Sequence, residues 1–355
     1  MRGLYIHVPF CLTKCPYCDF YSERFSRSLA EHYKSAVLRN LSCYDESFDT
    51  VYFGGGTPIL LAREIADILR GASFCEGAEA TVEANPCVTD RERLTLLFQS
   101  GVNRISFGVQ STQEEELRFL GRRHTPEQAE KAIIRAYDAG FRNISADLMI
   151  GLKDQTKASV SASVRALTAL PLTHFSVYLL KIEENTPFFA EKRETANEDE
   201  AAGLYLFTAE LLEEHGFRQY EISNFARTGY ECRHNLKYWR CEEYLGVGPA
   251  AHSYYKGKRF CTSRDLNVFL ERERQEAFVT DEAAGGFEEF AMLRLRLTEG
   301  LSFADCVRFG IEKETLLRRS ERIPPSYLRV TEEGIALTKR GFLVSNAVIG
   351  RLLGY

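Results

Sequence analysis

Apolar and polar positions repeat along residues 1–225 as units of strand, loop and helix. Each unit begins with a short run of β-branched or aromatic residues, continues through a Gly-rich or polar loop, and ends with apolar residues at helical spacing. Strands that alternate with helices pair in parallel through right-handed crossovers, which curls a sheet toward a barrel. Strands are therefore predicted near residues 3–8, 50–53, 79–84, 102–109, 143–149 and 174–181.

The predicted fold class is α/β, a partial TIM-like (β/α)6 barrel, and a closed barrel of eight units is the alternative. The predicted helices have recognisable ends. Capping-box spacing places helix starts at Thr89 with Glu92 and at Thr125 with Gln128. Three helices are expected to stop in Schellman motifs, in which Gly precedes an apolar residue, at Gly101-Val102, Gly140-Phe141 and Gly216-Phe217.

The pattern becomes less regular after the predicted barrel. We divide the chain into a core at 1–225, a connecting segment at 226–284 and a small, mainly α-helical domain at 285–355. The last domain is expected to resemble a winged helix, because helices precede a hairpin near 327–337 and a final helix starts at Arg340. Its charges of both signs are interspersed without a basic stripe, so a packing or lid role is favoured over DNA binding.

Composition narrows the function classes. Of the 355 residues, 45% are hydrophobic and 12% aromatic, which is enough for a large buried core. The net charge of −5 gives no sign of a nucleic-acid partner. No apolar run reaches the roughly 18 residues of a membrane helix, and no signal peptide precedes the first strand, so a cytoplasmic protein without an integral membrane segment is expected. Ten cysteines are then expected to be thiols or metal ligands.

Cys11, Cys15 and Cys18 stand in the spacing C-x3-C-x2-C directly after the first predicted strand. A structural zinc site needs four ligands, and the nearby position 20 holds Phe20. A [4Fe-4S] cluster held by three cysteines instead leaves one iron open for another ligand. The alternative, three thiols packed as small hydrophobes, is disfavoured because they are crowded into eight residues.

Polar residues follow several predicted strands. The second strand runs into Gly54-Gly55-Gly56-Thr57, and Glu83, Gln110 and Asp147 follow the next three strands. Because the carboxyl ends of parallel barrel strands meet at one rim, these side chains are expected to converge around a ligand. Each of them taken alone could equally be a helix cap.

Two histidine segments lie in the connecting segment. His234-Asn235-Leu236-Lys237-Tyr238-Trp239 holds the only Trp of the chain, and a second histidine, His252, ends a Gly-rich segment from 246 to 252. On residue types alone, a histidine beside aromatic residues is more often structural than a ligand.

The three-cysteine spacing and the glycine run together resemble radical S-adenosylmethionine (SAM) proteins. Over essentially the whole chain, the segments GGGTP, VEANP, GVQS, DLMIGL and GVGPAAHSY resemble the oxygen-independent coproporphyrinogen III oxidase family, and HNLKYW resembles its haem-chaperone branch. This resemblance implies a radical SAM barrel that binds haem and transfers it to acceptor proteins, such as haem proteins of the respiratory chain. An electron donor to the cluster is a second implied partner.

The resemblance also implies site residues. The cluster would be bound by Cys11, Cys15 and Cys18, and haem by His234, Asn235, Tyr238 and Trp239. Arg122 matches a SAM-contacting position, although Arg123 stands beside it. The full set implied for SAM is Tyr5, Tyr17, Gly55, Gly56, Thr57, Glu83, Gln110, Arg122 and Asp147.

The chain departs from the oxidase itself at two places. The oxidase has a fourth cysteine where this chain has Phe20, and an extension ahead of the cluster where this chain has ten residues before Cys11. Conversion of coproporphyrinogen III is therefore not expected. The alternative function is a radical SAM enzyme acting on a porphyrin or on another substrate, for example as a methyltransferase. Lys181 and Glu184-Asn185 differ from the common haem-chaperone pattern, and the other seven cysteines are interpreted as packing thiols.

Overall fold

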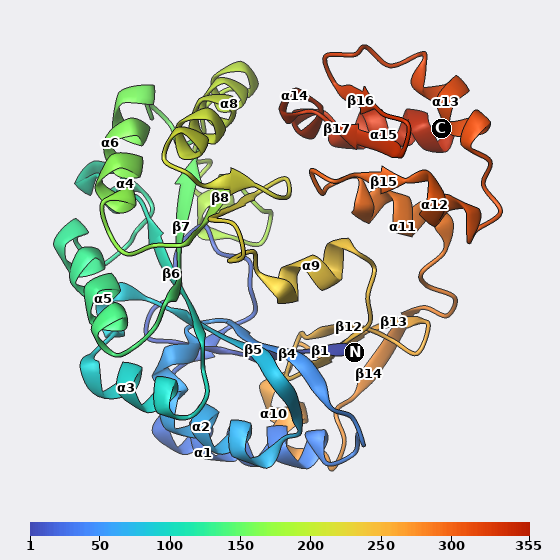
Figure 1. The fold of residues 1–355 in the computed structure, drawn as a ribbon. Helices are drawn as coiled ribbons and strands as arrows, with labels where there is room; N and C mark the ends of the chain where they lie inside the picture. The colour runs from blue at the N-terminus through green and yellow to red at the C-terminus, as the bar shows by residue number, and fades with distance from the viewer.

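Six neighbouring parallel strands form the wall of an open barrel in the computed structural model, which describes residues 1–355 (Figure 1). Each overlaps one of the six predicted strands, so the partial barrel is confirmed. The sheet ends in two separate edges, at β14 and β9, so the closed eight-unit alternative is wrong. The six strands are β1 (Arg2–Val8), β4 (Phe48–Gly55), β5 (Phe74–Ala84), β6 (Arg104–Gln110), β7 (Asn143–Ile150) and β8 (His174–Leu179).

Helices cover the outer face of this wall (Figure 1). The longer ones turn an apolar stripe toward the strands, and one hydrophobic core continues from the barrel into residues 285–355. The helices are α1 (Arg27–Leu41), α2 (Ala62–Gly71), α3 (Arg91–Gln99), α4 (Glu114–Phe119), α5 (Pro126–Asp138), α6 (Lys157–Thr168), α7 (Pro187–Ala190) and α8 (Glu198–Glu214), with 3-10 turns η1 (Pro58–Leu61) and η2 (Pro86–Val88).

Local capping fixes where these helices begin and end. Thr125 and Gln128 form the predicted capping box of α5. The predicted start at Thr89 is wrong by one residue, because the side chain of Asp90 accepts the Arg93 N–H and caps α3. All three predicted Schellman motifs are confirmed, at Gly101, Gly140 and Gly216. In each of them, the N–H groups of the glycine and of the next residue donate to backbone carbonyls of the preceding helix.

Residues 218–281 extend the sheet on both sides. The strand β11 (Tyr244–Val247), within the segment that the sequence presents as a Gly-rich loop, pairs in parallel with β1. Three antiparallel strands follow it on this side of the sheet, and two short strands lie beyond β8 on the other side. The whole sheet therefore has twelve strands. The added elements are β9 (Arg218–Gln219), β10 (Asn224–Ala226), α9 (Arg233–Trp239), β12 (His252–Tyr255), β13 (Lys258–Thr262), α10 (Leu266–Glu271) and β14 (Ala277–Asp281).

The C-terminal part combines short helices with a separate three-stranded sheet of order β15-β17-β16. The single helix expected from Arg340 is instead two helices separated by Val344. Helix α14 lies near α8 and α11 near α9 (Figure 1). The elements are α11 (Phe287–Arg294), β15 (Leu301–Ser302), α12 (Phe303–Val307), α13 (Lys313–Ser320), β16 (Leu328–Val330), β17 (Gly334–Leu337), α14 (Lys339–Leu343) and α15 (Ser345–Leu353).

Candidate functional site

The three cysteines lie on the loop that follows β1, at the carboxyl end of the barrel. Cys11 belongs to the two-residue strand β2 (Phe10–Cys11), which pairs with β3 (Glu23–Arg24). A turn closes between the Cys18 N–H and the Cys15 carbonyl at 3.1 Å. Burial raises the pKa of the Cys11 and Cys18 thiols. The loop therefore holds three thiols, each of them partly buried.

Two neighbouring groups point at these sulfurs. The Arg122 guanidinium donates to Cys15 Sγ at 3.3 Å, and the Thr57 hydroxyl donates to Cys11 Sγ at 3.5 Å. The neighbouring Arg123 donates to Thr13 instead. Of the two arginines, Arg122 is therefore the one placed beside the cysteines. A guanidinium at this distance stabilises a thiolate, the form in which cysteine binds a metal.

The strand-end residues share one cavity with the cysteines. It measures about 580 Å³ and opens at the carboxyl rim of the barrel. The structure thus brings together nearly all of the residues that the sequence places at strand ends or in the loop. The predicted residues that line the cavity are Cys11, Cys15, Tyr17, Cys18, Gly55, Gly56, Thr57, Glu83, Gln110, Arg122 and Asp147.

Tyr5 is the one predicted SAM residue that does not line this cavity. Its hydroxyl donates to His7 Nδ1 at 3.0 Å, while His7 Nε2 donates to the Tyr21 carbonyl at 2.9 Å. The Tyr5 ring also stacks on Tyr52 inside the barrel. Tyr5 therefore lies below the cavity and helps to position its floor.

The glycine run has a packing role that the sequence did not reveal. A Cβ on Gly56 would lie 2.6 Å from the Phe10 carbonyl oxygen, and Gly55 has φ +111°, which side chains rarely adopt. The Gly56 and Thr57 N–H groups donate to the Val8 and Phe10 carbonyls. Glycine at these positions allows the backbone at the end of β4 to pack closely against the backbone of the cysteine loop.

Two half-buried carboxyl groups line the same cavity as the cysteines. Glu83 accepts hydrogen bonds from the Tyr52 hydroxyl at 2.8 Å and from the Gly55 N–H at 3.1 Å. Burial, followed by the charge of Asp147, raises the pKa of Glu83 to about 7. Burial likewise raises the pKa of Asp147 to about 6, although the Ser176 and Ser106 hydroxyls oppose the shift. Both carboxylates would be stabilised by a cationic ligand.

Gln110 adds a polar atom without a partner. Its side-chain oxygen Oε1 is buried and makes no hydrogen bond within the protein, and its backbone has φ +69°. A buried acceptor in a cavity wall is costly unless a ligand or water satisfies it. Gln110 therefore indicates that the cavity is built to hold a polar ligand.

Sequence reasoning missed several lining residues. The alternation of side chains along strands could have identified some of them, because Ser106 pairs with Ser145 of β7, two residues before Asp147, and side chains two apart share a face. Tyr178 at the end of β8 faces the cavity for the same reason. The missed polar residues are Thr13, Lys14, Asp19, Ser22, Asn85, Ser106, Tyr178, Lys181 and Glu183.

The three thiols suit a multinuclear cluster better than one zinc ion. No group of three or more His, Cys, Asp or Glu side chains is close enough to hold a single metal ion. A zinc site needs four close ligands, whereas a [4Fe-4S] cluster takes each thiolate on a different iron and fills the space between them. The open cavity between Cys11, Cys15 and Cys18 fits the latter.

The HNLKYW segment lies elsewhere. His234 on α9 is fully buried near the amino ends of β1 and β4. Its Nδ1 is 2.8 Å from the Thr50 hydroxyl, its Nε2 is 2.8 Å from the Tyr238 hydroxyl, and its ring stacks on Tyr52. Asn235 and Trp239 are half-buried on the same helix. The structure therefore does not present His234 to a ligand, because neither ring nitrogen is free.

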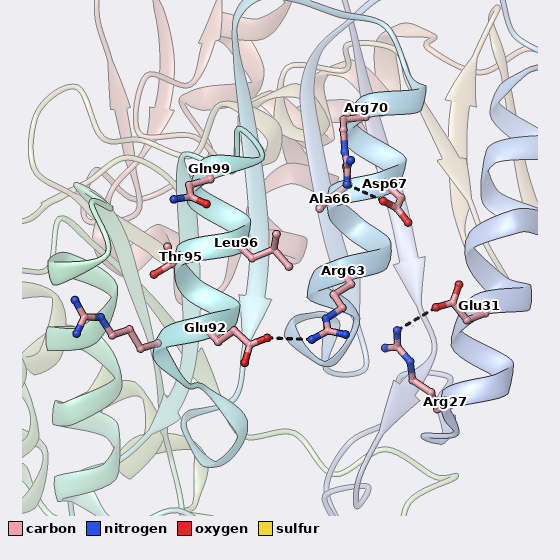
Figure 2. A pocket seen from close by; sticks show the side chains of 11 residues that line it. Arg27, Glu31, Arg63, Ala66, Asp67, Arg70, Glu92, Thr95, Leu96 and Gln99 are labelled. Carbon is pink, nitrogen blue, oxygen red and sulfur yellow. Dashed lines mark hydrogen bonds and ion pairs between the residues drawn. The ribbon is translucent and has the colours of Figure 1, made fainter.

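A larger cavity of about 910 Å³ lies on the outside of the barrel between α1, α2 and α3. Figure 2 shows that its walls are ion pairs, including Arg63 with Glu92 and Arg70 with Asp67. It contains no cysteine and no strand-end residue. Paired surface charges of this kind have no reactive arrangement, so the cavity at the carboxyl rim is the candidate site.

This fold and site define a radical SAM protein. Residues 5–167 match the Radical SAM superfamily. The structure of coproporphyrinogen III oxidase (HemN) from Escherichia coli, titled a radical SAM enzyme, superposes with a TM-score of 0.82 over 99% of this chain and 90% of that chain. At 19% identity, this likeness shows a shared fold. Radical SAM proteins use a [4Fe-4S] cluster and SAM.

Full-length relatives give the family. The chain is 33% identical to the haem chaperone HemW of Bacillus subtilis, over 100% of both chains. It is 34% identical to the haem chaperone HemW of Escherichia coli, over 98% of this chain and 97% of the relative. The chain belongs to the HemW branch of the HemN-like family. None of its helices combines the length and apolar content that a membrane crossing requires.

Proposed function

We propose that this chain is a haem chaperone, which holds a [4Fe-4S] cluster and SAM in the rim cavity and binds haem for delivery to acceptor proteins. One observation carries the cofactor part: three thiols, two half-buried carboxyl groups and an unpartnered amide oxygen line one cavity. Full-length similarity to curated haem chaperones supports the haem part. The ten free cysteines fit a reducing compartment such as the cytoplasm.

Each group in the cavity has a defined task in this proposal. Cys11, Cys15 and Cys18 hold the cluster, which supplies electrons to SAM at the iron that no cysteine binds. Glu83 and Asp147 attract the positive charges of SAM into a site shielded from water. The other proposed SAM contacts are Tyr17, Gly55, Gly56, Thr57, Gln110 and Arg122, with Tyr5 supporting them from below.

Haem transfer, rather than porphyrin oxidation, is the proposed outcome. Phe20, where the oxidase has a fourth cysteine, lines the cavity mouth and is 66% exposed. A phenyl ring can contact a macrocycle but cannot bind iron through sulfur. We propose haem proteins, such as those of the respiratory chain, as acceptors and a separate protein as electron donor. The fold shared with HemN keeps a second candidate, an enzyme acting on a porphyrin or another substrate.

Anaerobic reconstitution tests the cofactor part. We expect one [4Fe-4S] cluster per chain, with a brown chromophore near roughly 400 nm that the Cys15→Ser variant loses. Cys43→Ser, an exposed cysteine far from the loop, is the matched control and should keep it. Retention of the full chromophore in Cys15→Ser, or zinc in place of iron, would contradict the cluster assignment.

Two activity assays separate the candidate functions. Haem-loaded protein mixed with an apo-haem protein should transfer haem faster and more completely than an equal amount of free haem. The reconstituted protein with SAM, reductant and coproporphyrinogen III should yield no protoporphyrinogen IX. Substantial turnover would overturn the chaperone proposal, and release of 5′-deoxyadenosine only with some other substrate would favour the second candidate.

A further inference from the structure

The protein has seven histidines, and five of them have ring nitrogens committed to hydrogen bonds. A haem-iron ligand needs a free imidazole nitrogen that a ligand can reach. The exposed His32 and His252 meet this requirement, and so does the half-buried His215, because only its Nδ1 is bonded and its Nε2 has no partner. The five bonded histidines are His7, His124, His174, His215 and His234.

Of these three histidines, only His252 lies on the sheet that builds the site. It begins β12, whereas His32 lies on the outer helix α1 and His215 ends the outer helix α8. Tyr5 pairs with Gly246 of β11, and Tyr244, two residues before Gly246, pairs with Tyr254 of β12. His252 lies two residues before Tyr254 and so shares its face. Residues paired across strands share a face of the sheet. Tyr5 faces the barrel interior, so His252 stands on the concave face as well.

His252 belongs to a row of residues that pair across β11 to β14 and share the concave face, and the rest of this row suits a flat apolar ligand. Gly246 is buried, because the His252 carbonyl oxygen lies directly against the position that a Cβ would take, so the exposed part of the row begins at His252. On the other side, His252 pairs with Cys261 and Cys261 pairs with Phe278. Phe278 is 51% exposed. The row therefore offers an exposed imidazole on β12 and an exposed aromatic ring two strands away on β14.

A positive charge without a carboxylate partner lies beside this row. The guanidinium of Arg264 donates to the Asp19 carbonyl of the cysteine loop at 3.2 Å and forms no ion pair. Partial burial, followed by the charges of Arg259 and Arg264, lowers the pKa of His252, which favours the neutral imidazole that binds a metal. Arg264 thus lies near His252 and also contacts the cysteine loop, through its hydrogen bond to the Asp19 carbonyl.

Haem matches this combination of groups. Its iron takes a neutral imidazole, its propionates are anions that pair with a guanidinium, and its macrocycle packs on aromatic rings such as Phe278 and Phe20. Resting on the proposed haem-chaperone function, we propose that His252 is the iron ligand of a haem bound on the concave face of β11 to β14, with Arg264 holding a propionate. Haem then lies beside the cysteine loop and outside the cavity of the cluster.

Titration with two porphyrins tests the iron ligand. Loss of even an outer partner of a ligating histidine weakens metal binding about 10–100-fold, so His252→Ala should weaken haem binding at least about tenfold and shift the Soret band. Binding of iron-free protoporphyrin IX should not change, because it offers no iron to the imidazole. His252→Met should bind haem with a different Soret spectrum, since a thioether replaces the imidazole. His32→Ala is the control and should leave both titrations unchanged.

A second pair of ligands tests the propionate contact. Arg264→Gln should weaken binding of haem but not of haem dimethyl ester, whose propionates carry no charge. Haem affinity and spectrum unchanged in His252→Ala would overturn the assignment of the ligand. If haem binding is then lost in His234→Ala or His32→Ala, the chaperone proposal stands with a different ligand. A wild-type protein that binds no haem would overturn both.

Discussion

Glu83 and Asp147 show how single residues shape the cavity. Both are carboxyl groups in the barrel interior, with hydroxyl groups as their main hydrogen-bond donors. No cationic side chain forms an ion pair with either of them. Buried charge without a partner lowers stability, and such cost is typical of functional sites. The two residues therefore favour ligand binding at the expense of the stability of the empty protein.

We expect the Asp147→Asn variant to be more stable than the wild type at pH 8 without ligands. The pKa of Asp147 is raised from 3.8 to about 6, so the folded state is favoured by protonation, and this contribution is lost as the pH rises through about 6. The gain at pH 8 should be on the order of 2–3 kcal/mol and should largely vanish at pH 4, with SAM binding weakened. Thermal unfolding at the two pH values measures it.

The exposed carboxylate of Asp67 on α2 provides the comparison for this experiment. Asp67→Asn removes the same charge from the surface, where exposed ion pairs contribute little. Its effect on the midpoint of unfolding should be small at both pH values. An Asp147→Asn variant that is less stable than the wild type at pH 8 would show that the carboxylate is compensated in the empty protein.

At the scale of elements, the helix ends fix how each unit returns to the sheet. Gly140 follows α5 with φ +113°, and the Phe141 N–H reaches back to the Ala136 carbonyl at 3.1 Å. Phe141 is then fully buried as the chain enters β7. The Schellman motif thus sets both the direction in which the chain leaves α5 and the residue that enters the core.

Gly140→Ala is expected to lower the free energy of unfolding by at least about 1–2 kcal/mol, because an L side chain disfavours this backbone conformation. The added Cβ would also lie 2.6 Å from Phe98 Cε1. Gly203→Ala is the matched control, since Gly203 lies inside α8 with no atom within 4 Å of the added Cβ. That variant should gain about 0.5–1 kcal/mol. Urea denaturation measures both, and equal effects would contradict the argument.

At the scale of the whole molecule, α9 closes the amino end of the barrel opposite the cavity. Glu79 of β5 accepts hydrogen bonds from the Arg233 and His234 N–H groups at the start of this helix. His234 in turn reaches Thr50 of β4. Residues at this end of a barrel contribute mainly to stability. The HNLKYW segment therefore joins the connecting segment to the barrel wall.

His234→Ala should accordingly lower the free energy of unfolding by on the order of 2–4 kcal/mol, because it leaves the buried Thr50 and Tyr238 hydroxyls without a partner. Asn235→Ala, on the same helix and half-buried, should change it by less than about 0.5 kcal/mol. Chemical denaturation of the ligand-free variants tests this. Equal stability of His234→Ala and the wild type would contradict this structural role of His234.

The sequence by itself determined the barrel units and the cysteine loop, because both depend on neighbouring residues. Hydrophobic period, caps and glycine stops act within one helix or strand, and C-x3-C-x2-C places three thiols on one loop whatever surrounds it. The sequence also predicted that Glu83, Gln110 and Asp147 lie close together, since the carboxyl ends of parallel strands meet at one rim.

Only the tertiary structure decided which histidine is buried and which is exposed. β11 pairs with β1 across some 240 residues of chain, and that pairing places His252 on the concave face. The same arrangement encloses His234 between α9 and β4. Sequence patterns record local spacing, whereas burial depends on which distant segments pair, so two histidines in similar aromatic surroundings end in opposite environments.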